Sequence, residues 1–171
     1  MKLAICWIFV LGLAIVPTSQ NLLNKDKVVY AINCGSTEGF RSEAGFDYRK
    51  DQYYKEGVVA DYPDNHPNMP REGIKYTKDT KLHQKERYSN KDWLEYDLPV
   101  EQDGSYVLIL QFCELNFMYM NQRVCHVYLG DSVVRPNHDT VKAGRQMQVN
   151  IYIPFELKDG VVTYSNYLEC S

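Results

Sequence analysis

A period of two in the apolar positions dominates this chain, and no stretch longer than a few residues repeats with the period of a helix. Such alternation predicts β-strands that turn one face toward a core. Residues 106–112 are apolar on both faces, which is typical of a central buried strand. The predicted strands are 28–32, 93–98, 106–112, 124–129 and 147–153.

Two of these runs predict which side chains are buried. In 93–98 the inward face carries Leu94, Tyr96 and Leu98. In 147–153 the alternation is cleaner, because apolar residues at every second position are separated by polar residues or a tyrosine. The inward set there is Met147, Val149, Ile151 and Ile153, and the outward set is Gln148, Asn150 and Tyr152.

Turn residues separate the predicted strands. Gly130-Asp131 and Asp159-Gly160 fit two-residue hairpin turns, and residues 102–104 link two further strands. Residues 61–71 contain three prolines and cannot form a central strand, so we expect a long loop on the rim. Many short strands without intervening helices predict an all-β protein, an antiparallel jelly-roll-like β-sandwich.

The first nineteen residues have the pattern of a signal peptide. Lys2 precedes a continuous apolar run at 3–16, and Pro17, Thr18 and Ser19 then break it. This run is shorter than the roughly 20 residues that span a bilayer. We therefore predict a signal peptide at 1–19, with an uncleaved anchor as the alternative, no further transmembrane segment, and a mature chain in the lumen of the secretory pathway or outside the cell.

Charge and cysteines narrow the function classes. A net charge of −3 provides no basic surface for nucleic acid. Four cysteines remain after residue 19, and their spacing matches no zinc site. Four cysteines allow three disulfide connectivities, and the sequence does not choose among them. For Cys113 and Cys125, which lie in or beside strand-like runs, we predict buried thiols. We expect no metal and no cofactor.

We find no catalytic residues in the sequence. None of the four histidines, at positions 66, 83, 126 and 138, sits in a nucleophile motif. Carboxylates are plentiful, but nothing singles out the facing pair that a glycosidase needs. Glu38, Glu43, Asp47 and Asp51 suggest a solvated acidic face. We therefore expect a protein that is not an enzyme.

Aromatic residues beside predicted loops are the remaining candidates for function. The chain has 14 tyrosines, and most of them fit the composition of a β-protein. Tyr62, Tyr88, Phe117 and Tyr119, however, lie where the chain turns. An exposed ring can stack on the CH face of a sugar while neighbouring polar groups bind the hydroxyls. Rings that converge at one edge of a sandwich would form a carbohydrate site.

A series of short segments resembles malectin domains. The order and spacing of these segments hold over most of the chain after the predicted signal peptide, from about residue 28 to about residue 162. The segments are VVYAINCG (28–35), FDYRKD (46–51), GVVADY (57–62), ERY (86–88), YDLPV (96–100), GSYVLILQFCELNF (104–117) and QRVCHVYLGDSVV (122–134).

This resemblance implies a non-catalytic lectin of the endoplasmic reticulum with a jelly-roll-like β-sandwich. The family's ligands are glucosylated N-glycans and small α-linked glucose disaccharides, in glycoprotein quality control. The implied partners are therefore glycans or glycoproteins that contain α-glucose. The implied stacking rings fall on Tyr62, Tyr88 and Phe117, with Asp61 close enough in sequence to assist.

The chain also departs from the family pattern. Asn116 stands where the family has a second aromatic residue, so a stacking surface is replaced by an amide. The predicted domain is 27–171 and incomplete at its C-terminal end, because residues 164–171 do not resemble the family's last strands. The alternative function, which the family also implies, is a receptor-like or adhesive ectodomain module that contacts protein.

Overall fold

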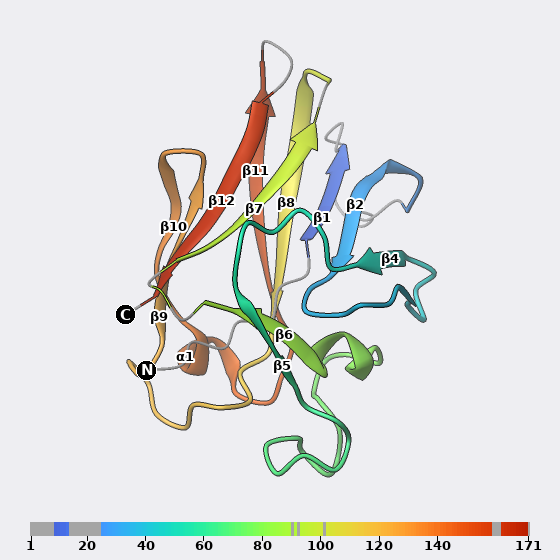
Figure 1. Ribbon diagram of the computed structural model, residues 1–171, viewed down its shortest axis with the longest axis vertical. Coiled ribbons are helices and arrows are strands. Elements are labelled where there is room, and N and C mark those ends of the chain that lie inside the picture. The colour runs from blue at the N-terminus through green and yellow to red at the C-terminus, as the bar shows by residue number, and fades with distance from the viewer. Residues whose placement is uncertain are drawn as a thin grey trace.

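The computed structural model shows a two-layered β-sandwich (Figure 1). It describes residues 9–13, 25–89, 91, 93–100, 102–158 and 162–170, and for 9–13, 25 and 162–170 only the backbone. The strands are β1 (Phe9–Leu13), β2 (Val28–Asn33), β3 (Phe40–Arg41), β4 (Asp47–Lys50), β5 (Val58–Asp61), β6 (Lys85–Tyr88), β7 (Trp93–Val100), β8 (Gly104–Phe112), β9 (Val124–Leu129), β10 (Ser132–Asp139), β11 (Val149–Leu157) and β12 (Val162–Cys170). The short helices are η1 (Lys25–Lys27), η2 (Thr80–His83) and α1 (Thr140–Gly144).

Two sheets enclose the main core. One has the strand order β11-β8-β1-β2-β4-β3, and the other has the order β10-β9-β12-β7. Both layers are visible in Figure 1, with the pair β5–β6 below them. The predicted all-β sandwich is confirmed. The named strands pair antiparallel except β2 and β4, which run parallel, with Ile32 opposite Arg49.

Strand predictions from period-two alternation agree well with the structure. All five predicted runs lie in strands, except Met147 and Gln148, which precede β11. Leu94, Tyr96 and Leu98 are each 1% exposed and belong to the main core. On β11 only Ile153 of the predicted inward set is fully buried, because β11 is the edge strand of its sheet. The alternation did not predict the remaining strands, β1, β3, β4, β5, β6, β10 and β12.

Part of the predicted signal peptide forms a strand in this structure. The backbone of Phe9–Leu13 lies between β2 and β8 and pairs antiparallel with both. The register places Val10 opposite Ala31 on one side and Ile109 on the other. Removal of the segment 1–19 would therefore leave a gap one strand wide in this sheet. Cleavage after residue 19 remains a prediction.

The hairpin turn at Gly130-Asp131 is confirmed. It connects β9 to β10 with Leu129 paired to Ser132, and Gly130 has a φ of 57°, which glycine adopts without strain. Residues 62–71 form a long loop made of turns, as the prolines predicted, and Asp61 is the last residue of β5. The turn predicted at Asp159-Gly160 lies outside the described residues.

The prediction of two buried thiols is half right. Cys113 is a buried thiol, and so is Cys34, directly after β2. Cys125, predicted as a thiol, is instead in a disulfide. This disulfide could not be predicted from the sequence, because the C-terminal segment was not predicted to form a strand. In the structure that segment is β12, and its backbone register sets residue 170 opposite Cys125.

A buried ion pair anchors β6 to the sandwich. Arg87 Nε donates to Asp51 Oδ2 at 2.5 Å, and both side chains are almost completely buried. Asp51 also accepts hydrogen bonds from Tyr96 and from the backbone of Gly35. The suggestion of a solvated acidic face is therefore wrong for Asp51. A Cβ on Gly35 would lie 2.6 Å from the backbone of Glu86, so only glycine permits this close approach.

Candidate functional site

A pocket of about 400 Å³ opens beside β5 and β6. This volume is in the range that holds a small ligand. Of the five residues predicted for the site, four line this single pocket: Asp61, Tyr62, Tyr88 and Asn116. The full lining is Ala60, Asp61, Tyr62, His66, Asn68, Glu86, Tyr88 and Asn116.

The register of β5 with β6 explains the inner wall of the pocket. Ala60 is paired with Glu86, and Val58 is paired with Tyr88. Directly opposed residues share a face, and so do residues two apart on one strand. Ala60, Glu86 and Tyr88 therefore line the same side, where the Tyr88 ring is half-buried. The Asp61 side chain lies on the opposite face of β5, where its carboxylate pairs with Lys85 at 2.9 Å.

Tyr62 is packed more deeply than its place in a proline-rich loop predicted. Its side chain is 5% exposed and belongs to a small core cluster with Met69 and Ile74. The expectation of an exposed stacking ring is therefore wrong for Tyr62. Its hydroxyl donates to Glu86 Oε1 at 2.6 Å, and its ring meets that of His66 edge-on at 4.9 Å.

Glu86 is a buried carboxyl group in the wall of the pocket. Its residue surface is 4% exposed. Burial disfavours the ionised form and raises the pKa of Glu86 to about 7, although the hydrogen bond from Tyr62 and the charge of Arg123 act in the opposite direction. Burial and the nearby Glu86 also raise the pKa of the Tyr62 hydroxyl well above its usual range.

Asn116 links the two sides of the pocket. Its Nδ2 donates to the Tyr62 hydroxyl at 2.6 Å, and its Oδ1 accepts from Asn68 Nδ2 at 2.8 Å. Asn68 comes from the long loop after β5, whereas Asn116 comes from the segment after β8. The amide at this position therefore holds two distant segments together, a role that an aromatic residue could not fill.

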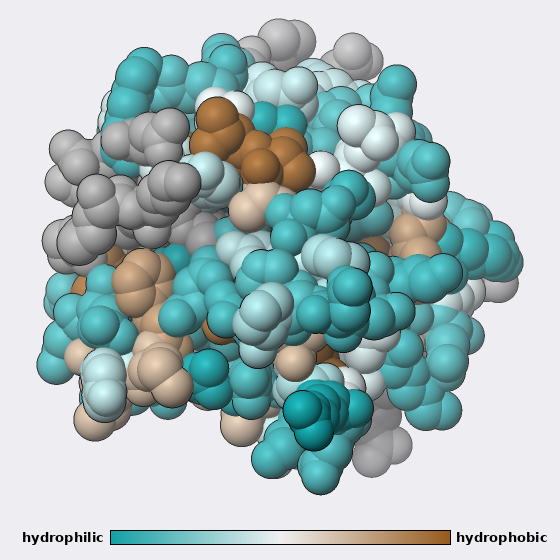
Figure 2. Space-filling view, turned by 60° about the horizontal axis from the view of Figure 1, so that its bottom comes forward, coloured by the Kyte–Doolittle hydropathy of each residue, from teal (hydrophilic) through white to brown (hydrophobic). Residues whose placement is uncertain are grey.

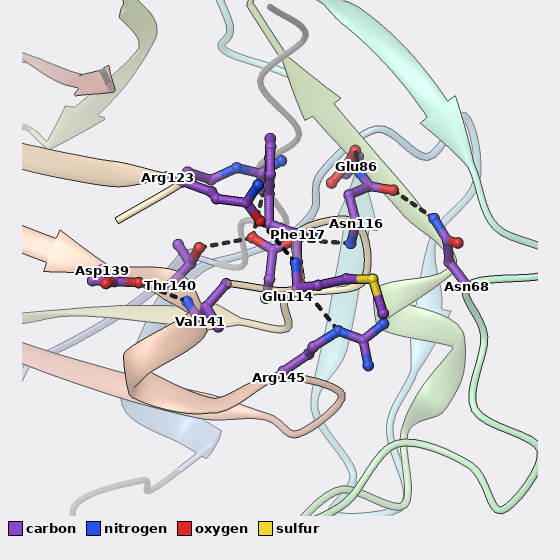
Figure 3. Close-up of polar contacts among 12 residues, drawn as sticks. Asn68, Glu86, Glu114, Asn116, Phe117, Arg123, Asp139, Thr140, Val141 and Arg145 are labelled. Carbon is purple, nitrogen blue, oxygen red and sulfur yellow. Dashed lines mark hydrogen bonds and ion pairs between the residues drawn. The ribbon is translucent and has the colours of Figure 1, made fainter. Parts of the chain in front are cut away.

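Glu114 holds the segment that carries Asn116. Its Oε1 accepts from the backbone nitrogens of Asn116 and Phe117, at 2.8 and 3.0 Å. Its Oε2 accepts from Thr140 at 2.7 Å and pairs with Arg123 at 3.0 Å, with both charged side chains buried. Figure 3 shows Glu114 in the middle of these contacts, with Asn116 leading from it toward Asn68 and Glu86.

Phe117 is not among the lining residues of the pocket. Its ring lies beneath the Arg123 guanidinium, whose central carbon is 4.3 Å from the ring centroid. Arg145 Nε also donates to its carbonyl oxygen. The structure therefore separates Phe117 from the other four predicted site residues. Tyr119, the remaining loop aromatic, is 70% exposed and also lies outside the pocket lining.

Sequence reasoning missed four lining residues: Ala60, His66, Asn68 and Glu86. Glu86 was visible within the ERY segment, yet the sequence alone does not show which face of a short strand turns toward a pocket. Asn68 and His66 lie in a loop without periodicity. In the parts of the chain that the structure describes, no cluster of His, Cys, Asp or Glu could hold a metal ion. The same parts contain no helix long and apolar enough to cross a membrane.

Comparison with known proteins identifies relatives over most of the chain. The family profile described as Malectin domain matches residues 28–170. Malectin-A of Xenopus laevis is 34% identical over 137 residues, which cover 79% of this chain and 48% of that protein. Malectin of Homo sapiens is 30% identical over 152 residues, covering 88% and 50%. The chain thus spans about half the length of these relatives.

Solved structures with a similar fold include plant receptor ectodomains. The plant receptor-like kinase FER superposes with a TM-score of 0.64 at 19% identity, covering 83% of this chain and 43% of that chain. The ANX1 ectodomain from Arabidopsis thaliana gives a TM-score of 0.59 at 14% identity, covering 94% and 48%. At these identities the similarity concerns the fold alone.

Proposed function

Because this chain belongs to the malectin-domain family, we propose that it binds carbohydrate through the pocket beside β5 and β6 and catalyses no reaction. The main support is the meeting of four predicted residues, Asp61, Tyr62, Tyr88 and Asn116, in one cavity. They come from three segments that are distant in sequence: the end of β5 with the residue after it, the end of β6, and the segment after β8.

The pocket offers both kinds of contact that a sugar needs. The half-buried Tyr88 ring and the methyl group of Ala60 provide an apolar surface for the CH face of a pyranose. Asn68, Asn116 and His66 provide donors and acceptors for its hydroxyls. Tyr62 acts mainly through its hydroxyl and through packing, because little of its ring is exposed.

The carboxylates of the pocket are engaged in contacts that favour binding over catalysis. Glu86 accepts from Tyr62, and the Asp61 carboxylate is paired with Lys85. A glycosidase needs one carboxyl group that donates a proton and a second that acts as base or nucleophile across the scissile bond. Glu86, with its raised pKa, could donate a proton. The Asp61 carboxylate, which would have to act as the base or nucleophile, is instead paired with Lys85 on β6.

We further propose that the ligand is an α-glucose unit of a glucosylated N-glycan in the lumen of the endoplasmic reticulum. It rests on the family and on the predicted signal peptide. The pocket supports it through its size, since about 400 Å³ holds one or two sugar units and not a whole glycan. The rest of the glycan and its protein would remain outside the pocket.

A glycan array tests this proposal. High-mannose glycans that end in α-glucose should retain the protein, the same glycans without glucose should not, and maltose in solution should compete. Binding that does not depend on glucose would contradict the finer assignment. A complete lack of binding to any glycan would contradict carbohydrate binding and favour a module that contacts protein.

A further inference from the structure

One of the two carboxylate oxygens of Glu86 makes no hydrogen bond with the described part of the chain. Oε1 accepts from the Tyr62 hydroxyl at 2.6 Å and from Asn116 Nδ2 at 3.5 Å, whereas no donor of the described residues reaches Oε2. The residue surface of Glu86 is only 4% exposed. An unpaired polar atom of a buried side chain is costly. The Oε2 atom therefore lacks a partner that a ligand can supply.

This oxygen faces the pocket and not a closed cavity. The described side-chain polar atoms that are both enclosed and unpaired belong to Asn33, Glu56, Arg123 and His138. Glu86 Oε2 is not among them, so it keeps some contact with solvent. Glu86 lines the pocket beside β5 and β6, and Figure 3 shows it next to Asn116, another lining residue. A ligand therefore reaches Oε2 through this pocket.

The hydrogen bonds around Tyr62 determine where a proton on Glu86 lies. Asn116 Nδ2 donates to the Tyr62 hydroxyl oxygen at 2.6 Å, so the hydroxyl proton is directed toward Glu86 Oε1. Oε1 is thus an acceptor in both protonation states, and a proton on this carboxyl group is carried by Oε2. Neutral Glu86 presents an O–H group to the pocket, whereas ionised Glu86 presents a charged acceptor.

Charged and titratable groups approach Glu86 from several elements. On its own side these groups are Tyr62 and His66 after β5, Cys113 and Glu114 after β8, and Arg123 before β9. On the opposite face of the β5–β6 pair, Asp61 is paired with Lys85, and Arg87 with Asp51. The charges of Arg123 and Glu114 largely offset each other, because the two are paired at 3.0 Å. Burial therefore dominates and raises the pKa of Glu86 to about 7, so one further hydrogen bond can change its charge near neutral pH.

The end of the molecule that carries β5 and β6 has a mostly hydrophilic surface. Figure 2 brings this end forward and shows hydrophilic side chains over most of it, with a small strongly hydrophobic area near the top. A surface of this kind favours a polar ligand that is recognised through hydrogen bonds. A sugar hydroxyl fits the open oxygen of Glu86, because it can donate to a carboxylate.

We propose that Glu86 Oε2 accepts a hydrogen bond from a hydroxyl of the sugar in the pocket, and that binding thereby releases a proton from Glu86 to the solvent. This inference rests on the proposed carbohydrate function and adds a specificity-determining residue to the same site. A hydrogen bond to an ionised acceptor is about twice as strong as a neutral one. The sugar therefore binds more tightly to ionised Glu86, and its affinity increases as pH rises.

Calorimetric titration of maltose at different pH values measures this coupling in the full chain. If the ligand lowers the pKa of Glu86 from about 7 to about 6, the affinity should be about five- to tenfold higher at pH 8 than at pH 5.5. At pH 6.5 each bound maltose should release about half a proton. Titrations in buffers with different enthalpies of ionisation count these protons, and a purely structural role of Glu86 would release none.

The variant Glu86→Gln imitates the neutral group. Its oxygen can accept from Tyr62, while its amide nitrogen faces the pocket and cannot accept a hydroxyl proton. We expect it to bind maltose as wild type does at pH 5.5, about five- to tenfold more weakly than wild type at pH 8, and without proton release. Circular dichroism at each pH checks that the variant is folded.

The matched control is His66→Asn, which removes the imidazole from the lining of the same pocket. Asparagine keeps an acceptor for the backbone nitrogen of Asn68, which His66 Nδ1 provides in the wild type. Whatever its own affinity for maltose, this variant should keep the ratio of affinities between pH 8 and pH 5.5. Loss of that ratio would assign the pH dependence to the imidazole and overturn the proposal.

Monodeoxy analogues of methyl α-glucoside, each lacking one hydroxyl, identify the group that Glu86 binds. At pH 8 the wild type should lose about tenfold in affinity for one of them, and with that analogue the pH dependence should disappear. In Glu86→Gln the same deletion should have a much smaller effect, because the charged acceptor is already absent.

The other outcomes separate this inference from the function on which it rests. A maltose affinity that is equal at both pH values, or a pH dependence that persists in Glu86→Gln, overturns the proposal and leaves carbohydrate binding intact. An affinity that falls as pH rises would mean that protonated Oε2 donates to the ligand, which also overturns it. Failure to bind maltose and methyl α-glucoside at every pH overturns the carbohydrate function, and this inference with it.

Discussion

The hydroxyl of Tyr62 donates a 2.6 Å hydrogen bond to Oε1 of Glu86, and this bond joins the long loop to the wall of the pocket. Both residues are almost completely buried, so neither can be replaced without consequences for stability. Asn116 donates to the same hydroxyl and extends the contact to the segment after β8. The pocket is therefore held by a polar network at its base and bounded by residues that can meet a ligand.

Replacing Tyr62 with phenylalanine isolates the contribution of that hydrogen bond. Tyr62→Phe keeps the ring in its apolar cluster but leaves the Glu86 carboxyl group without its shortest donor. A buried polar group that loses its partner costs about 1–3 kcal/mol. We expect the free energy of unfolding to fall by about this amount in urea titrations at pH 8. An unchanged value would show that the bond makes no net contribution.

The stability of the protein should depend on the ionisation of Glu86. Its pKa is about 7 in the folded protein, against 4.5 for the unperturbed group. Between these values the folded protein binds more protons than the unfolded chain, so the free energy of unfolding falls as pH rises through this window. Glu86 contributes most to stability below pH 4.5, and this contribution is lost as pH passes 7.

The variant Glu86→Gln tests this pH dependence. Its side chain can accept the Tyr62 hydrogen bond and cannot ionise, so it avoids the cost of a buried charge. We expect wild type to lose stability relative to Glu86→Gln between pH 5 and pH 8, by an amount on the order of a few kcal/mol. Urea titrations of both proteins at the two pH values measure it. Parallel pH profiles for the two proteins would contradict the raised pKa.

Asn116→Ala should weaken ligand binding more than it weakens the fold. It removes the hydrogen bonds to Tyr62 and Asn68, so the loop that carries Asn68 loses its tie to the segment after β8. Asn116 is only partly buried, so we expect a destabilisation of about 1 kcal/mol. Maltose affinity should fall about five- to tenfold. Thermal denaturation and calorimetry on the same sample distinguish the two effects.

Removal of the N-terminal segment should destabilise the six-stranded sheet. Strand β1 pairs with β8 over five residues and also with β2, so its loss leaves two strand edges unpaired. We expect the chain that starts at residue 20 to be less stable than the full chain by at least about 2 kcal/mol. A synthetic peptide of residues 7–15 should restore part of the loss. Equal stability of the two chains would mean that β1 does not contribute to the sheet.

The parts of the fold that follow from local pattern were predictable, and those that depend on tertiary context were not. The alternation correctly placed Leu94, Tyr96 and Leu98 in the core, because every second side chain of a strand lies on the same face and that face of β7 is buried. The disulfide of Cys125 was missed because it depends on strand order. Tyr62 was taken for an exposed ring, since a proline-rich loop gives no sign that its first residue packs inward.

The candidate site shows the same division. Family resemblance selected Tyr88 and Asn116, which line the pocket, because short segments can be aligned without a structure. The same resemblance selected Phe117, but its ring lies beneath the Arg123 guanidinium and outside the pocket lining. Glu86 was not assigned to the site, because its burial arises from the pairing of β5 with β6.

We expect the Tyr88 ring to contact a glucose unit in the pocket, and calorimetric titration of maltose into Tyr88→Ala tests this contact most directly. Tyr152→Ala, which removes an exposed tyrosine of β11 outside the pocket, is the control. We predict that Tyr88→Ala lowers the affinity for maltose at least about tenfold, a loss of about 1.4 kcal/mol in binding free energy, while Tyr152→Ala leaves it unchanged. Equal affinities of wild type and both variants for maltose would contradict the account.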